Sequence, residues 1–409
     1  MEPGFFNNFL QTNMLVSFGL ILLIGLIGGQ LAHIARYFPR VTGYLFFGFI
    51  LGPHATGLLS EKIIEQSAVF KEIAIGLILF ELGLQINYKF LRSHSSLIWT
   101  AVFQSSIVFL MIFLGLPLFH VGWIVAALCA AIGISISPAI TMLIANEYHA
   151  KGTVINYSLI LTALNNILSF VAYAVVIAIA EQYTTHPSIA YTTTIEWVYP
   201  FYQMAGAVIL AYIGSVIMIT LGRFIGKKEN MQFILLVGML VIVLGISKLL
   251  YVSPFLSMLM FGMLTFNLDQ NEYLMEVELG YLGEIFIVIL FVMVGAELHT
   301  EYLIDSGLIV FMFILLRAIG YILPIVFMKK ILHFSHRQAL SLGITFLPMA
   351  GVAIALLATT EQLTREYYPF LSFIILPAVA ILEMLGPVTT IMGLRWSGEL
   401  DDKHGDISH

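Results

Sequence analysis

The chain has 409 residues, of which 60% are hydrophobic and only 10% are charged, and its formal net charge is −6. A mean hydropathy of +0.97 excludes an ordinary soluble domain, which is about half apolar and about one quarter charged. Nucleic-acid binding is not expected, because no basic cluster is larger than Lys227–Lys228 or Lys329–Lys330. The single cysteine, Cys129, lies in an apolar run, so neither an internal disulfide nor a thiolate metal site is expected.

Apolar runs of membrane-spanning length follow one another along the chain. A hydrocarbon core about 30 Å thick needs about 20 apolar residues per helix. On this rule the sequence predicts an all-α polytopic protein with about thirteen spans in the lipid bilayer. The first run, from Met14, is too long for the apolar part of a cleaved signal peptide, and we interpret it as a retained span. The predicted spans cover residues 14–35, 41–59, 68–87, 95–117, 122–145, 155–180, 198–221, 231–250, 253–267, 282–299, 306–328, 338–358 and 369–392.

The basic residues predict the orientation of these spans. With the N-terminus outside, 13 of the 18 lysine and arginine residues fall on the cytoplasmic side. Four of them fall outside (Lys62, Lys71, Lys248 and Arg365), and Arg317 lies within a span. We therefore expect a multi-pass protein of the cell (inner or plasma) membrane with an outer N-terminus and a cytoplasmic C-terminus.

Two of the predicted spans are interrupted. The fifth reads Gly-Ile-Ser-Ile-Ser-Pro-Ala at residues 133–139, and the twelfth reads Thr-Phe-Leu-Pro-Met-Ala-Gly at residues 345–351. Because proline removes a backbone hydrogen bond, we expect helix breaks at Pro138 and at Pro348 and Gly351, near mid-membrane. Paired breaks in corresponding positions of two halves indicate the binding site of a transporter, and two ordinary proline kinks are the alternative.

The spacing of the two interrupted spans also predicts inverted repeats with crossed discontinuous helices. They lie seven spans apart, so six spans, a linker span and six further spans of opposite orientation would make up one transmembrane domain over residues 1–409. The first repeat would cover residues 1–181, the linker span 182–229, the second repeat 230–395 and a short tail 396–409.

Several polar side chains lie inside predicted spans. Polar and charged groups are costly in a bilayer, so each is expected to have a structural partner or a function. Arg317 lies in the middle of the eleventh span, Glu383 in the thirteenth and Glu81 in the third. Asn165 and Asn166 occupy the middle of the sixth. By depth, Arg317, Glu383 and the two asparagines lie at the level of the breaks, so they can form one cluster.

Each of these groups has two interpretations. Arg317 keeps its charge and needs an anion or several carbonyl groups nearby, and Glu383 is its expected partner, in a fixed ion pair or as a titrating group. Glu81 either lines an inlet or packs against a neighbour. The asparagines either contact the substrate or tie helices together. The candidate ion-binding residues carry hydroxyl or amide groups: Ser135, Ser137, Thr162, Asn165 and Asn166.

Several short motifs, in order along the chain, resemble those of the monovalent cation:proton antiporter superfamily. Gly-Tyr-Leu-Phe-Phe-Gly-Phe-Ile-Leu-Gly-Pro-His-Ala-Thr-Gly at residues 43–57 looks like its second-span signature, and Phe-Glu-Leu-Gly-Leu-Gln-Ile-Asn at 80–87 resembles its third-span motif. Ser-Pro-Phe-Leu-Ser-Met-Leu-Met-Phe-Gly at 253–262 and Val-Met-Val-Gly-Ala-Glu at 292–297 are similar to its ninth and tenth spans. The most similar branch contains bacterial sodium/proton exchangers and glutathione-gated potassium efflux systems. The resemblance implies Na⁺ or K⁺ and H⁺ as substrates, and a homodimer in which a core domain moves against a scaffold domain.

The sequence departs from that family where the family binds its ions. The sixth-span position that matches Asn165–Asn166 usually ends in an aspartate, which binds the cation and the proton in turn. An amide does not titrate and cannot replace that carboxylate. Gln85 stands in place of the usual third-span glutamate, and Glu81 appears one turn earlier. No Gly-x-Gly-x-x-Gly occurs, so we expect no nucleotide-binding domain, and neither a cofactor nor a resident metal.

Three functions stay open on the sequence alone. The first is a proton-coupled antiporter of a monovalent cation that works by alternating access, with Glu383 or Glu81 as the proton carrier. The second is an uncoupled carrier of an anion or a neutral solute, which the asparagines and Arg317 would suit. The third is a non-transporting sensor that keeps the fold. An enzyme is not expected, because the sequence has no His-Glu-x-x-His, no Gly-x-Ser-x-Gly and no aspartate within a predicted span.

Overall fold

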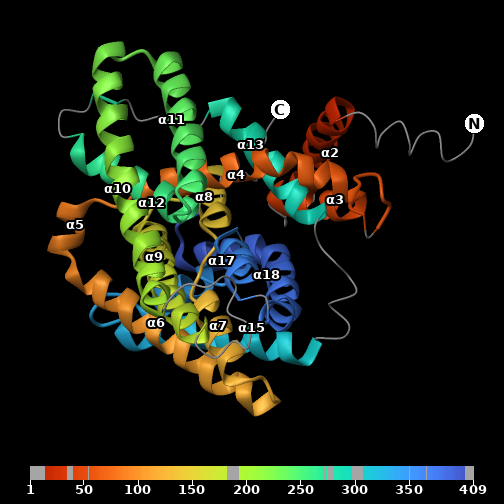
Figure 1. The fold of residues 1–409 in the computed structure, drawn as a ribbon, viewed down its shortest axis with the longest axis vertical. Helices are drawn as coiled ribbons and strands as arrows, with labels where there is room; N and C mark the ends of the chain where they lie inside the picture. Colours follow the sequence, from red (N-terminus) through yellow and green to blue (C-terminus); the bar gives the residue numbers. More distant parts are fainter. Residues whose placement is uncertain are drawn as a thin grey trace, which may run out of the picture.

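The computed structural model describes residues 14–34, 40–53, 55–181, 193–269, 273–274, 280–296, 307–349, 351–364 and 366–400. In this part of the chain every regular element is a helix (Figure 1), which confirms the predicted all-α class. Seven of these helices are long and apolar enough to cross a membrane, and four shorter ones are also apolar. The chain is therefore a polytopic membrane protein. Residues 182–192 of the predicted linker and the tail beyond residue 400 lie outside the described residues.

The helices overlap the predicted spans, with bounds that differ by up to eight residues. In the first half of the chain they are α2 (Met14–Ile34), α3 (Arg40–Leu51), α4 (Glu61–Leu84), α5 (Tyr88–Ser93), α6 (Ser95–Gly115), the 3-10 turn η1 (Leu116–Phe119), α7 (Trp123–Gly133), α8 (Pro138–Glu147) and α9 (Thr153–Glu181). In the second half they are α10 (Thr193–Ile225), α11 (Glu229–Leu249), α12 (Pro254–Leu268), α13 (Gly280–Ala296), α15 (Gly307–Met328), α16 (His336–Thr345), α17 (Gly351–Leu363) and α18 (Tyr368–Ser397).

Both predicted breaks are present. The fifth span ends its first helix at Gly133 and starts the second at Pro138, and the twelfth stops at Thr345 and resumes at Gly351. The short helix α5 was not predicted. It begins because the side chain of Asn87 accepts a hydrogen bond from the amide of Phe90 at 3.1 Å, which caps its first turn.

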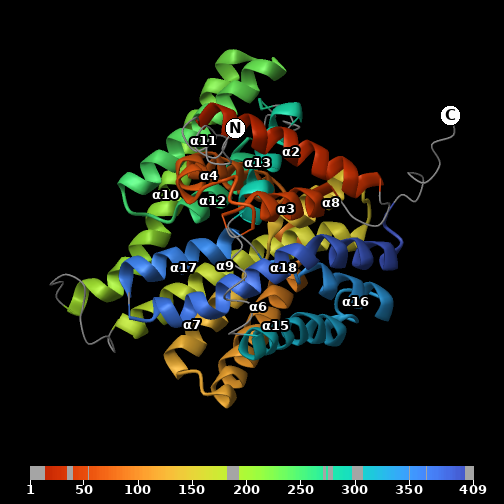
Figure 2. The same cartoon turned by 90° about the vertical axis from the view of Figure 1, so that its right-hand side faces the viewer.

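Two groups of helices pack against each other (Figures 1 and 2). The first group combines α2, α3 and α4 with α10, α11, α12 and α13, and the second combines α6 to α9 with α15 to α18. Each group therefore draws helices from both halves of the chain. The two broken spans lie in the second group, where α8 contacts α4 of the first group and α18 contacts α3.

Glycines allow α4 and α12 to pack backbone against backbone. A Cβ atom on Gly262 would overlap the carbonyl oxygen of Phe80 and lie 2.8 Å from the carbonyl carbon of the same residue. A Cβ on Gly83 would lie 2.7 Å from the amide nitrogen of Met263. Small residues at such a contact are typical of helices that associate in a membrane. This contact fixes α4, which carries Glu81, against the rest of the first group.

We predict that Gly262→Ala lowers the thermal stability of the purified protein in detergent. The added methyl group meets backbone atoms, which cannot rotate away, so the expected cost is on the order of 2 kcal/mol. The matched control is Gly238→Ala in α11, where a Cβ would meet nothing within 4 Å. That control should leave stability unchanged or raise it slightly, because alanine favours a helix. A Gly262→Ala protein as stable as the control would show that the two helices are not in backbone contact.

Candidate functional site

Arg317 of α15 is fully buried and joins the two breaks. Its Nε donates to the carbonyl oxygen of Gly133 at 2.9 Å, and Nη2 donates to Ser135 at 2.7 Å, both at the end of α7. In the other break, Nη1 donates to the carbonyl of Leu347 at 2.6 Å and Nη2 reaches Pro348 at 3.4 Å. Carbonyl groups at the C-terminal end of a helix carry partial negative charge and lack partners, so one guanidinium stabilises both ends.

Tyr321 lies one turn after Arg317 and completes this arrangement. Its hydroxyl donates to the carbonyl of Ile134, so three successive carbonyl groups at residues 133–135 accept hydrogen bonds from α15. The ring of Tyr321 lies under the guanidinium, with Cζ of Arg317 4.8 Å from its centroid. The breaks also contact each other directly, because the amide of Ser137 donates to the carbonyl of Pro348 at 3.0 Å.

The expected ion pair between Arg317 and Glu383 is not formed. Every side-chain hydrogen bond of Arg317 goes to a backbone carbonyl. The sequence analysis had named several carbonyl groups as the alternative to an anion. Glu383, which is 1% exposed in α18, lies instead in the wall of a cavity beyond the breaks. The prediction failed because a guanidinium has donors for several acceptors, and four backbone carbonyl groups at two helix ends can replace one carboxylate.

Asn166 holds the first break from the side of α9. Its Oδ1 accepts from the amide of Ile136 at 3.0 Å, and its Nδ2 donates to the carbonyl of the same residue at 3.1 Å. The amide side chain thus pairs with both backbone groups of one unwound residue. An ionised aspartate here could accept from the amide but could not donate to the carbonyl, so this geometry requires asparagine rather than the carboxylate that the resemblance implies.

Asn165 faces a different neighbour. Its Nδ2 donates to Oε1 of Gln104 at 3.0 Å, and its Oδ1 accepts from the hydroxyl of Ser105 at 2.6 Å, both in α6. Gln104 in turn donates to the carbonyl of Tyr321 at 3.2 Å. Both asparagines are fully buried. Their hydrogen bonds favour the interpretation that they tie helices together.

The three predicted hydroxyl residues differ in their contacts. Ser135 donates to the carbonyl of Ile132 at 2.7 Å and so belongs to the end of α7. The hydroxyl groups of Ser137 and Thr162 are buried and find no hydrogen-bond partner among the described residues. Ser137 lies in the cavity wall, whereas Thr162 does not.

The cavity has a volume of about 190 Å³ and lies where the second helix of each broken span begins. Ser137 and Pro138 at the start of α8 and Gly351 at the start of α17 form one side of it. Helices α4, α12 and α13 of the first group form the other side, mostly with apolar side chains. The cavity therefore lies at the boundary between the two helix groups.

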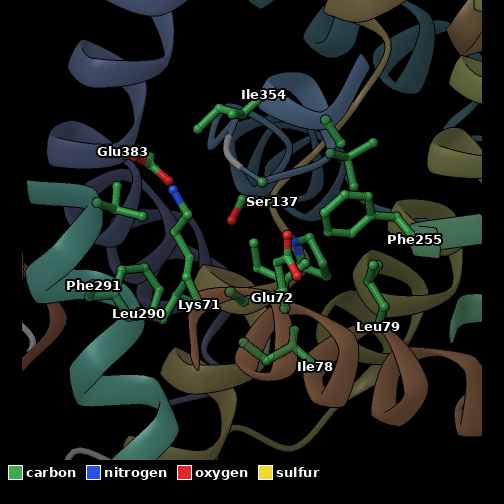
Figure 3. Close-up of a pocket in the computed structure, with 17 residues that line it drawn as sticks. Lys71, Glu72, Ile78, Leu79, Ser137, Phe255, Leu290, Phe291, Ile354 and Glu383 are labelled. Atoms are coloured by element: carbon green, nitrogen blue, oxygen red, sulfur yellow. The ribbon is translucent and has the colours of Figure 1, made fainter. Parts of the chain in front are cut away.

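Three charged side chains line this cavity among the described residues: Lys71, Glu72 and Glu383. In Figure 3 the ammonium end of Lys71 points toward the carboxylate of Glu383, and the hydroxyl of Ser137 lies between the walls. Glu72 forms an ion pair with Lys248 of α11. The cavity thus holds one lysine and one glutamate that face each other, and a second glutamate whose charge is already balanced.

Glu81 lies apart from this site. It is in α4, ten residues after Lys71, a separation of about 15 Å along a helix. It does not line the cavity, and it makes no hydrogen bond or ion pair with any residue that the structure describes. The structure therefore brings Arg317, Asn165, Asn166, Ser135 and Tyr321 together at the breaks and Glu383 with Ser137 at the cavity, but leaves Glu81 outside.

The sequence analysis missed Lys71 as a cavity residue and placed it on the outer surface. The helix begins at Glu61 rather than near residue 68, so Lys71 is in its middle. The signal that could have shown this is the stretch from Glu61 to Phe70, whose charged residues alternate with apolar ones at helical spacing. Tyr321 and Gln104 were also missed, because a single polar group in an apolar helix gives no indication of its partner.

Comparisons with known proteins agree with this architecture. The sequence profile described as "Sodium/hydrogen exchanger, transmembrane" matches residues 19–388. A structure of a sodium proton antiporter from Methanocaldococcus jannaschii at pH 8 has a similar fold, with a TM-score of 0.68, 16% identity, and coverage of 94% of this chain and 97% of that one. An electron-microscopy structure of the same antiporter has a TM-score of 0.71 at 16% identity, covering 94% and 96%. No curated protein matches this chain in sequence.

We predict that Arg317 and Glu383 contribute independently to stability. Arg317→Gln removes hydrogen bonds from four carbonyls at two helix ends and should destabilise the protein by on the order of 3 kcal/mol. Because the two side chains share no partner, the double variant with Glu383→Gln should lose the sum of the two single effects, to within about 0.5 kcal/mol. Thermal unfolding in detergent measures all three. A double variant that is more stable than Arg317→Gln alone would instead indicate a direct ion pair.

Proposed function

Because the chain belongs to the sodium/hydrogen exchanger family, we propose that it exchanges a monovalent cation, Na⁺ or K⁺, for protons across the cell membrane by alternating access. The observation that carries the proposal is Glu383, a buried carboxylate in the wall of a cavity that ends at two helix breaks. Interrupted helices that face a cavity at the boundary of two helix groups are the usual place of a transporter's binding site.

Glu383 is the group that we assign as proton carrier. A carrier has to titrate, has to be reachable from a cavity and has to lie beside the part of the protein that moves. Glu383 meets these conditions. Asn166 does not titrate, and its amide is used in two hydrogen bonds to Ile136. Glu81 titrates but does not reach the cavity.

The coupling follows from competition at one carboxylate. When Glu383 is ionised, it can bind a cation together with other oxygen atoms, and the unpartnered hydroxyl of Ser137 is in the same cavity wall. When Glu383 is protonated, this attraction is lost and the cation leaves. The apparent affinity for the cation should therefore fall as the pH falls.

Movement of the second helix group against the first would open the site to alternate sides. The cavity walls come from both groups, so a small displacement of one group changes access to Glu383. Arg317, Tyr321 and Asn166 hold the two breaks to each other and to α9, so the second group can move as one body.

Orientation and assembly are further parts of this proposal. The distribution of lysine and arginine supports an outer N-terminus. Helix α4 then runs inward from Glu61 to Leu84, so Lys71 and the cavity lie nearer the outer side than Glu81 does. A homodimer follows from the family resemblance. The first helix group would supply its interface.

We predict that reconstituted wild-type protein releases protons from vesicles when Na⁺ or K⁺ is added. Glu383→Gln should abolish this exchange, because glutamine keeps the shape but cannot carry a proton. Glu81→Gln is the matched control and should retain it, since Glu81 lies outside the cavity. A pH-sensitive dye in the vesicle lumen measures the flux.

Two outcomes would contradict the proposal in different ways. Exchange that survives Glu383→Gln would show that another group carries the proton. A folded wild-type protein that shows no flux with Na⁺, K⁺ or Li⁺ over a range of pH would show that cation exchange is not its function.

A further inference from the structure

We propose that the cavity at the starts of α8 and α17 is also an anion site, which binds one small monovalent anion or monocarboxylate whenever Glu383 is protonated. The proposal goes beyond cation exchange. It rests on the proposed function for the uptake of a proton by Glu383, and it uses the same cavity and the same Ser137 hydroxyl.

Two helix N-termini face this cavity. Helix α8 has 10 residues and starts at Pro138, and helix α17 has 13 residues and starts at Gly351. Their first residues, Pro138, Ala139, Gly351 and Val352, lie in the cavity wall. The first amide groups of a helix have no acceptor within it, and the helix dipole adds positive potential at this end, so N-termini attract anions.

A buried hydroxyl points into the same space. Ser137 is 1% exposed, its Oγ has no hydrogen-bond partner among the residues that the structure describes, and Figure 3 shows it between the cavity walls. A buried donor without an acceptor is unfavourable, because the water that it bonded in the unfolded chain is not replaced. An anion in the cavity would accept this hydrogen bond. The hydroxyl is therefore an observation independent of the helix ends.

Lys71 supplies a positive charge from the opposite wall. The charged groups that face it are Glu383 of α18 and Glu72 of α4, and Glu72 is paired with Lys248. Helices α8, α12, α13 and α17 contribute no charged side chain to the wall among the described residues. When the cavity holds no cation, Lys71 and the two helix ends thus balance one carboxylate, that of Glu383.

Protonation of Glu383 removes that balance. The wall then holds a lysine and two helix N-termini, and its one remaining carboxylate among the described residues, that of Glu72, is paired with Lys248. An anion from solution can therefore take the place of the carboxylate of Glu383. One proton and one anion bind together, so the charge of the site does not change. Anion binding should accordingly strengthen as the pH falls and weaken as Glu383 ionises.

The size and lining of the cavity define the ligand. A volume of about 190 Å³ holds chloride, nitrate or acetate. One lysine cannot balance a multiply charged phosphate. The remaining walls are mostly apolar, with side chains such as Ile75, Leu79 and Phe291, which suits the methyl group of a short carboxylate. Acetate is therefore the first probe and chloride the second.

The test is equilibrium dialysis of the purified full-length protein in detergent with radiolabelled acetate, with gluconate holding the ionic strength constant. Wild type should bind acetate at acidic pH, and the affinity should drop at least about tenfold at alkaline pH, where Glu383 competes. Glu383→Gln should bind at both pH values, because glutamine mimics the protonated state. Lys71→Gln should weaken binding at least about tenfold, and Ser137→Ala a few fold.

The matched controls are Lys62→Gln and Glu61→Gln. Both residues are exposed in the first turn of α4, so neither variant should alter acetate binding. Opposite effects of Glu383→Gln and Lys71→Gln are the signature of the site, since a general loss of structure would weaken binding in both. If Lys71→Gln does not fold, Lys71→Arg keeps the charge and should retain binding. The opposite effects expected of Glu383→Gln and Ser137→Ala then test the site.

The proposal is overturned if wild type binds no acetate or chloride at acidic pH. It is also overturned if Glu383→Gln binds no better than wild type at alkaline pH. Because the measurement needs no gradient, it is independent of transport. Acetate binding without cation-driven proton flux would reject the antiport proposal alone, and normal flux without acetate binding would reject the anion site alone.

Discussion

Four helix ends meet at the two breaks, and each leaves backbone groups without partners inside a membrane protein. The carbonyl groups at the ends of α7 and α16 are satisfied by one side chain, Arg317, with help from Tyr321. In a membrane, irregular backbone is tolerated only where protein groups or water satisfy it. Asn166 satisfies the unwound backbone further, because its side-chain amide pairs with both backbone groups of Ile136.

The amino-terminal ends of α8 and α17 have a different environment, and the proposed function depends on that difference. They face a cavity instead of a buried arginine, and Glu383, Lys71 and Ser137 lie in its wall. The guanidinium of Arg317 is thus held by backbone carbonyl groups on one side of the breaks, and Glu383, Lys71 and Ser137 line the cavity on the other side. Under the proposed function, this division leaves Glu383 to bind protons in a member of the family that has asparagines in the sixth span.

The breaks themselves could be predicted from the sequence, because a proline in an apolar run removes a backbone hydrogen bond, as at Pro138 and Pro348. The partner of Arg317 could not, since residues 133–135 and 347–348 are far from it along the chain and offer only backbone atoms. Lys71 was misplaced because charged residues in the first turns of α4 conceal where that helix begins. A helix break can therefore be predicted from one sequence, whereas the partner of a side chain on a distant helix can be identified only in the folded structure.

Hydrogen–deuterium exchange of the two breaks in wild type and in Arg317→Met tests most directly whether Arg317 holds them together. The amides of Ile136 and Ser137 are bonded to Asn166 and to Pro348, so peptides that contain residues 133–139 should be protected in the wild-type protein. Loss of the guanidinium should release both breaks, and protection at 133–139 and at 345–349 should fall together while that of α4 stays the same. Unchanged protection of both segments in Arg317→Met would contradict the role assigned to this residue.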